Sequence, residues 1–149
     1  MIFETLLGGY VALFAAALVA ATILPAQSEL LFGVMLVSGR FDPALLLAVA
    51  TAGNVLGSIV NWVLGRYFAH YREKQWFPAS PATMTRAAAR FARFGPAVLL
   101  LSWVPVIGDP LTLFAGVLRM RFAIFLLVVT LAKGGRYLFL AFAVTNWSA

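Results

Sequence analysis

Four ionisable residues lie in strongly apolar parts of this sequence. Glu29 falls within "LPAQSELLFG", Asp109 within "VPVIGDPLTL", and Lys133 and Arg136 within a third apolar stretch. A charge held at membrane depth is costly unless it is paired, solvated or neutralised. A carboxylate that can be either protonated or paired with a cation can couple proton entry to a conformational step. These four residues are therefore the candidate proton-coupling and substrate-binding groups.

A structural role for the same side chains stays open. Glu29 and Asp109 could cap exposed backbone amides where the chain breaks its helix. Lys133 and Arg136 could form a structural ion pair, or they could bind an anion. Charge type and spacing alone do not separate these roles.

Other kinds of chemistry find little support. The chain has no cysteine and a single histidine, His70, which excludes a thiolate nucleophile, a disulfide framework and a multi-histidine or cysteine metal site. We find no serine–histidine–aspartate arrangement and no phosphate-binding glycine loop before a helix. An intramembrane aspartyl protease needs paired aspartates on spanning helices, whereas one partner here is Glu29. We therefore expect no enzyme, no cofactor and no metal site.

The composition indicates that much of the chain lies in a lipid bilayer rather than in water. Of 149 residues, 63% are hydrophobic and only 11% are charged, and the mean hydropathy is +0.97. A soluble domain of this size could not bury so much apolar surface, so we expect a polytopic membrane protein. The N-terminus carries Glu4 and no basic segment, which favours a retained helix over a cleaved signal peptide. We expect a single integral membrane domain over residues 1–149.

The first apolar stretch is too long for one crossing. Residues 5–39 contain one charge, Glu29, and as one helix they would measure about 52 Å against a hydrocarbon core of roughly 30 Å. Pro25 suggests a division in which residues 5–24 cross once and residues 25–39 dip in and return. Such a re-entrant segment requires protein or a watery cavity around its backbone.

The next span is expected over residues 43–65, which carry no charge. Small residues recur along it at every fourth position, which places them on one helix face: Gly53, Gly57, Asn61 and Gly65. Such a face lets another helix approach closely. We interpret the glycines as packing residues, while Asn54 and Asn61 could either bond to a neighbouring helix or line a cavity.

A basic region follows over residues 67–93. Ser80 and Pro81 are typical of a helix N-cap and first position. In the helix expected over residues 81–93, three arginines share one face and apolar side chains, Phe91 among them, share the other: Arg86, Arg90 and Arg93 against Met84, Ala88 and Phe91. This pattern predicts a helix lying at the membrane surface, in the cytoplasm by the positive-inside rule. Basic residues beside membrane spans do not favour nucleic acid as a partner.

A second broken segment covers residues 94–118. Its breaking residues are Pro96, Pro105, Gly108 and Pro110, and it could either cross once or dip and return. A return keeps Arg119 and Arg121 in the cytoplasm, as the charge rule prefers. The last span is then expected over residues 122–147, with the C-terminus outside.

The two broken segments match each other along the chain. Pro25 and Glu29 correspond to Pro105 and Asp109 at an offset of 80 residues, and further pairs follow at an offset of 81: Arg40-Phe41 with Arg121-Phe122, and Gly53 with Gly134. We therefore expect an all-α polytopic membrane protein with an inverted repeat. Two re-entrant helical hairpins, Pro25 and Pro105 in their breaks, would face each other in repeats of about 5–66 and 94–149, as in many secondary transporters.

Several of these segments resemble the DedA family of membrane proteins, which carry a SNARE-associated or VTT domain, and in particular its short YqaA-like branch. The resemblance rests on the residues from Pro25 to Glu29 and on three longer stretches: "GNVLGSIVNWVLGR" at 53–66, "FARFG" at 91–95 and "SWVPVIGDPLTLFAG" at 102–116. It covers most of the chain. The chain departs from the family where typical members place arginines around the second proline, because it has Trp103 and Asp109 there.

The resemblance implies two facing hairpins and a lipid-moving or proton-dependent transporter of the bacterial inner membrane. Its expected substrate is an anionic lipid carrier such as undecaprenyl phosphate, or another phospholipid, with lipid phosphate contacts at Arg66, Arg93 and Arg119. Protons and membrane lipids would be its partners, and a homo-oligomer is compatible with the sequence. Two alternatives remain: proton-coupled transport of a small solute or ion, and a membrane assembly factor that transports nothing.

Overall fold

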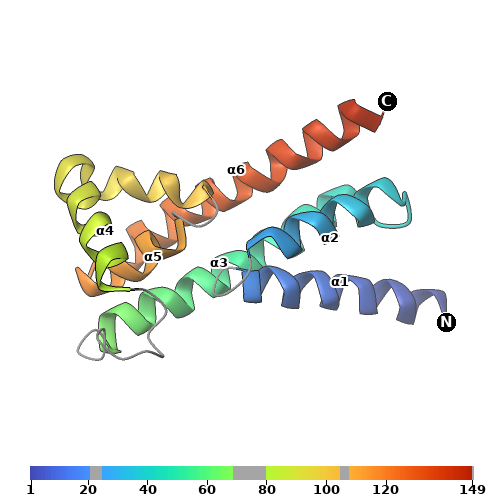
Figure 1. Cartoon of the computed structure of the whole chain (residues 1–149). Helices are drawn as coiled ribbons and strands as arrows, with labels where there is room; N and C mark the ends of the chain where they lie inside the picture. Colours follow the sequence, from blue (N-terminus) through green and yellow to red (C-terminus); the bar gives the residue numbers. More distant parts are fainter. Residues whose placement is uncertain (21–24, 69–79, 105–107, 149) are drawn as a thin grey trace. The chain divides into compact units, whose positions relative to one another are not determined.

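Helices make up all the regular structure in the described part of the chain. The computed structural model describes residues 1–20, 25–68, 80–104 and 108–148. In chain order its elements are α1 (Ile2–Ala20), α2 (Pro25–Val37), α3 (Pro43–Phe68), α4 (Pro81–Phe94), the 3₁₀-helix η2 (Gly95–Trp103), α5 (Gly108–Val117) and α6 (Phe122–Ser148) (Figure 1). The predicted all-α class is confirmed for these residues.

Among the described residues, three helices are long and apolar enough to cross a membrane. They cover Ile2–Val19 of α1, Pro43–Tyr67 of α3 and Phe122–Trp147 of α6. The last two agree closely with the spans expected over residues 43–65 and 122–147. Helix α2 has 13 residues and is about 20 Å long, which is less than the hydrocarbon thickness of roughly 30 Å.

The segment expected to dip and return has a different form. Residues 25–37 are one continuous helix, so the chain does not reverse within α2. Pro25 is the first residue of that helix, where a missing backbone N–H costs nothing and the fixed φ of proline suits the helix. Helices α1 and α2 lie side by side and run in opposite directions (Figure 1).

The chain forms two compact units, and their bounds differ from those of the two predicted repeats. The first comprises residues 1–57 and 133–149, and the second comprises residues 58–132. Helix α3 therefore begins in the first unit and ends in the second, while α6 begins in the second and ends in the first. The predicted repeats, at about 5–66 and 94–149, cut the chain elsewhere.

The first unit has an apolar core made from four helices. Its buried side chains come from α1, α2, α3 and α6: Leu13, Phe32, Met35, Leu46, Ala50 and Tyr137. Helix α3 starts after a polar cap, because the Asp42 carboxylate accepts a hydrogen bond from the backbone N–H of Leu45 at 2.9 Å. Close helix packing marks the same unit, since a Cβ added to Gly53 would lie 2.5 Å from the carbonyl oxygen of Phe14.

The second unit contains the predicted amphipathic helix. Helix α4 starts at Pro81 behind Ser80, whose hydroxyl accepts a hydrogen bond from the Thr83 N–H at 3.2 Å. This confirms the helix and its cap. Met84 and Phe91 are buried and Arg86 is exposed, and Met84 packs on Leu113 of α5. The apolar face of α4 therefore contacts α5.

The second broken segment consists of two helices packed on each other. Helix η2 ends at Trp103 and α5 begins at Gly108, and the two are in contact. A Cβ on Gly108 would lie 2.6 Å from the carbonyl oxygen of Ser102, so only glycine fits this approach. Pro110 lies in the first turn of α5, where the helix tolerates it. Pro105 lies outside the described residues.

Candidate functional site

The candidate site in the first unit is an ion pair between α2 and α6. Arg136 Nε lies 3.4 Å from Glu29 Oε1, and the two side chains are 5% and 24% exposed. Pro25 starts α2 one turn before Glu29. A buried cation and a carboxylate at this distance neutralise each other's charge, which lowers the cost of holding both away from water.

Aromatic and hydroxyl groups surround this pair. Tyr137 is fully buried, and its hydroxyl lies 2.9 Å from the Ser28 hydroxyl, a hydrogen bond that either group can donate. The guanidinium carbon of Arg136 lies 5.1 Å from the centroid of the Tyr137 ring, a cation–π distance. The Phe32 ring packs against Tyr137 at 5.4 Å. Adjacent residues of α2 thus meet adjacent residues of α6.

Lys133 lies on the same face of α6, three residues before Arg136. It is 2% exposed. Arg136 follows the start of α6 by 14 residues, or about 21 Å of a helix about 40 Å long. Both cations are thus near the middle of a candidate span, the depth at which a charge is most costly.

Asn54 holds α3 against α1 in the same unit. Its side-chain amide donates a hydrogen bond to the carbonyl oxygen of Ala17 at 3.0 Å, and the residue is 1% exposed. This contact accounts for one of the two roles expected of Asn54, a bond to a neighbouring helix.

A neutral polar cluster occupies the second unit. The Asn61 amide donates to the Thr112 hydroxyl at 3.3 Å, and that hydroxyl donates to the Asp109 carbonyl oxygen at 2.7 Å. Asp109 itself is half-buried in the first turn of α5, where a carboxylate is favoured by the helix dipole. Asn61 and Thr112 thus link α3 to the start of α5.

Very close backbone packing joins the same two helices. A Cβ on Gly65 would overlap the carbonyl oxygen of Leu113, and one on Gly116 would overlap that of Trp62. Small residues on α5 repeat the four-residue spacing seen on α3: Gly108, Thr112 and Gly116. These facing rows let the two backbones approach closely.

The three expected phosphate contacts are separate residues of the second unit. Arg66 is half-buried in the last turn of α3, and its guanidinium carbon lies 5.2 Å from the Trp62 ring centroid. Arg93 is exposed, with its guanidinium 5.1 Å from the Phe94 ring. Arg119 is exposed in the turn between α5 and α6. The three arginines lie on different elements, namely α3, α4 and the turn after α5.

The structure therefore brings some of the expected groups together. Glu29 and Arg136 form an ion pair with Lys133 on the same helix face, and Asn61 lies near the start of α5. Glu29 and Asp109 belong to different units, so their expected meeting in one central cavity stays a prediction.

Sequence reasoning did not single out Ser28 and Tyr137. A signal was present for Tyr137, because it follows Lys133 by four residues and therefore lies on the same helix face as Lys133. Ser28 directly precedes Glu29, but that spacing gives no reason to expect a partner 109 residues away.

Comparisons with known proteins agree with these features. The VTT domain model matches residues 1–146. The chain is 38% identical over 134 residues to the inner membrane protein YqaA of Escherichia coli K12, covering 90% of this chain and 89% of that protein. YqaA of Shigella flexneri matches equally, and an uncharacterised protein of Haemophilus influenzae is 34% identical over 140 residues, 89% of this chain and 85% of the relative. No solved structure matches. The chain belongs to the VTT-domain family, also called the DedA family.

Proposed function

We propose that this protein is a transporter that moves an anionic lipid across the bilayer, either a polyprenyl-phosphate carrier or another phospholipid, in exchange with protons. The observation that carries the proposal is the Glu29–Arg136 ion pair, in which Arg136 is buried near the middle of the candidate span α6, three residues after the buried Lys133. Ionisable groups at this depth are rare in membrane proteins and mark substrate and proton pathways. We propose no enzymatic reaction for the protein.

The pair suits the exchange of a proton for an anionic headgroup. A guanidinium is charged at physiological pH, whereas a carboxylate is a group that can accept a proton. A lipid phosphate that replaces the carboxylate beside Arg136 would keep the cation paired. In this mechanism Glu29 takes up the proton as the phosphate arrives and releases it as the phosphate leaves.

The inverted repeat with two re-entrant hairpins is the architecture we propose for this exchange, with the continuous helix α2 as one arm of the first hairpin rather than the whole of it. Helix α2 is too short to cross a bilayer, and α3 and α6 each contribute to both units. We place Asp109 as the counterpart of Glu29 in the second hairpin. The location we propose is the bacterial inner membrane, as in the name of the YqaA relatives.

Reconstitution into liposomes tests the proposal directly. Flipping of a short-chain polyprenyl phosphate and of a labelled phosphatidylglycerol would be measured beside proton flux, for the natural protein and for Arg136→Lys, Arg136→Gln and Glu29→Gln. We expect Arg136→Gln to abolish flipping and Arg136→Lys to retain part of it, because lysine keeps the charge but not the planar contact. Glu29→Gln should uncouple flipping from proton flux.

A matched control removes a cation that the proposal does not use. Arg40 is exposed in the turn before α3, and Arg40→Gln should leave flipping and proton flux unchanged. Proton flux driven by a small solute in the absence of lipid flipping would favour the small-solute transporter instead. Natural levels of flipping in folded Arg136→Gln protein would exclude the proposed role of the pair.

The proposed orientation has its own test. We place the N-terminus and residues 67–93 in the cytoplasm and the C-terminus outside, on the positive-inside rule. The chain has no cysteine, so single cysteines can be introduced without removing others. A cysteine at Met120 should react with an impermeant thiol reagent only from the cytoplasmic side. Labelling there from the outside would reverse the scheme.

A further inference from the structure

One side chain of α6, Tyr137, is held at two points by a single face of α2. Its hydroxyl lies 2.9 Å from the Ser28 hydroxyl, and its ring centroid lies 5.4 Å from that of Phe32, with the two rings tilted by 58°. Ser28 and Phe32 are four residues apart, so they lie on the same face of α2, and all three residues are fully buried. A hydrogen bond at one end of the side chain and a ring contact together fix the orientation of Tyr137.

The Tyr137 ring in turn lies against the guanidinium of Arg136. The guanidinium carbon is 5.1 Å from the ring centroid, and Arg136 is 4% exposed. A cation–π contact is stronger where water is excluded. The arginine side chain is long and has many rotamers, so a contact at its end restricts the positions that the guanidinium takes.

The ion pair with Glu29 constrains the direction of the guanidinium less. Arg136 Nε lies 3.4 Å from Glu29 Oε1, whereas a charge-assisted hydrogen bond is about 2.7–2.9 Å long. Coulomb attraction between two charges depends on their distance rather than on an angle. The hydrogen bond, the ring contact and the ion pair therefore form a connected series from Ser28 through Tyr137 and Arg136 to Glu29.

We propose that Tyr137 and Ser28 are positioning residues for the anion site at Arg136. The Ser28 hydroxyl fixes the Tyr137 ring, and the ring holds the guanidinium where it meets Glu29 or the anionic headgroup that replaces the carboxylate. A group that is already in place loses less entropy when it binds a partner. The effect on transport rests on the proposed function, whereas the effect on the guanidinium rests only on the contacts between α2 and α6.

Hydrogen exchange of the Arg136 side chain tests the positioning role without a transport step. Full-length protein, isotopically labelled at its arginines, is studied by NMR in micelles, and the Arg136 Nε–H signal is identified by its loss in Arg136→Lys. Tyr137→Leu removes the ring and should raise the rate of exchange with water by about tenfold. Tyr137→Phe keeps the ring and loses only the bond to Ser28, so it should raise the rate by about threefold, and Ser28→Ala should match it.

The order of the contacts gives a sharper test. Because Ser28 acts through the Tyr137 hydroxyl, Ser28→Ala combined with Tyr137→Phe should equal either change alone, and Ser28→Ala should add nothing to Tyr137→Leu. A full further increase in either combination would show that Ser28 reaches Arg136 by another route, and it would overturn the proposal. Exchange at the natural rate in Tyr137→Phe would overturn it as well. Tyr137→Phe keeps the ring in the core, so this outcome is measurable even where Tyr137→Leu does not fold.

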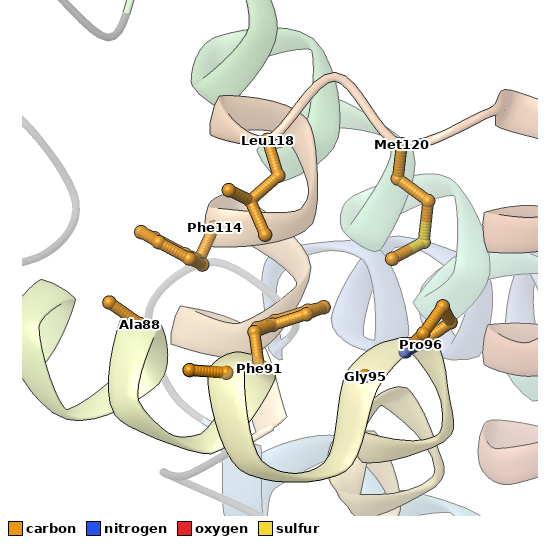
Figure 2. A pocket seen from close by; sticks show the side chains of 8 residues that line it. Ala88, Phe91, Gly95, Pro96, Phe114, Leu118 and Met120 are labelled. Atoms are coloured by element: carbon orange, nitrogen blue, oxygen red, sulfur yellow. The ribbon is translucent and has the colours of Figure 1, made fainter.

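Matched controls remove the same groups away from Arg136. Tyr10 accepts a hydrogen bond from the backbone N–H of Asp42 at 3.0 Å, so Tyr10→Phe loses a tyrosine hydroxyl bond in the same unit. Phe91 is buried in the second unit, where it lines an apolar groove together with Phe114 (Figure 2), so Phe91→Leu loses a buried ring. Both controls should leave the Arg136 exchange rate unchanged. A rise equal to that of the Tyr137 variants would show a general loss of stability and would contradict the positioning role.

The liposome assay then measures what positioning does for transport. Tyr137→Phe should raise the half-saturating fraction of the flipped lipid by about threefold and leave the maximal rate unchanged, because Arg136 and Glu29 are both retained. A change in the maximal rate alone would exclude a role in binding. If the natural protein flips no lipid, the proposed function fails, while the exchange measurement still decides whether Tyr137 and Ser28 position Arg136.

Discussion

The two units of this protein use polar groups in different ways. In the first, an ion pair between the half-buried Glu29 and the buried Arg136 joins α2 to α6. In the second, the contact between α3 and α5 is made by neutral groups and by backbone, through Asn61, Thr112 and the glycines beside them. The comparison indicates that the first unit keeps a charged pair that is costly to desolvate, whereas the contact between α3 and α5 in the second unit depends on close packing.

Loss of the buried cation should have the largest effect on stability. Arg136→Gln leaves Glu29 without its cation, and removal of one partner of a buried pair costs about 3 kcal/mol. The free energy of unfolding in mixed detergent micelles would be measured against Arg40→Gln, which should be close to neutral. Glu29→Gln combined with Arg136→Gln should recover most of the loss. Equal stability of Arg136→Gln and Arg40→Gln would show that the pair adds nothing.

A smaller loss is expected when the backbones of α3 and α5 are forced apart. Gly116→Ala places a methyl group against the Trp62 carbonyl, and overpacking of this kind costs about 2 kcal/mol. Gly134→Ala is the matched control, since its Cβ would make only ordinary contacts with the Thr51 side chain, at 3.6 and 4.0 Å, and alanine favours the helix. If both substitutions behave alike, close approach does not hold the second unit together.

The smallest effects should come from the neutral hydrogen bonds. In double-mutant cycles, Tyr137→Phe with Ser28→Ala and Asn61→Leu with Thr112→Val should each give a coupling of about 0.6 kcal/mol, the average for such bonds in a membrane. The Ser28–Tyr137 pair is shorter, at 2.9 Å against 3.3 Å, so its coupling should be the larger. A coupling as large as the loss in Arg136→Gln would remove the distinction between the units.

Much of the fold was predictable because its signals are local. The spans of α3 and α6 follow from uninterrupted apolar runs, and α4 follows from its periodicity and from the Ser80 cap before Pro81. Pro25 was interpreted as a break although it starts a helix, as Pro43 and Pro81 do. The difference is that Leu24 before Pro25 is no capping residue, whereas Ser80 is.

The site was only partly predictable, because its contacts join distant parts of the chain. Glu29 was expected to meet Lys133 or Arg136, and the two cations share one face of α6, so periodicity does not choose between them. The structure pairs Glu29 with Arg136. The division of α3 and α6 between two units could not be predicted from the sequence either. A helical pattern shows which face of a helix is apolar but not which neighbouring helix covers that face.

The division of α6 between the units has a consequence for biogenesis. The ribosome makes Ser28 long before Tyr137, its partner 109 residues later, which corresponds to about 5–20 s of elongation. During that interval the Glu29 carboxylate is in the translocon or the bilayer without the arginine that will neutralise it. Neither unit can be completed before α6 is inserted, so the nascent chain matures in a single late step. A chain that ends before α6 would therefore hold an acidic group in the bilayer without its cation, which is costly.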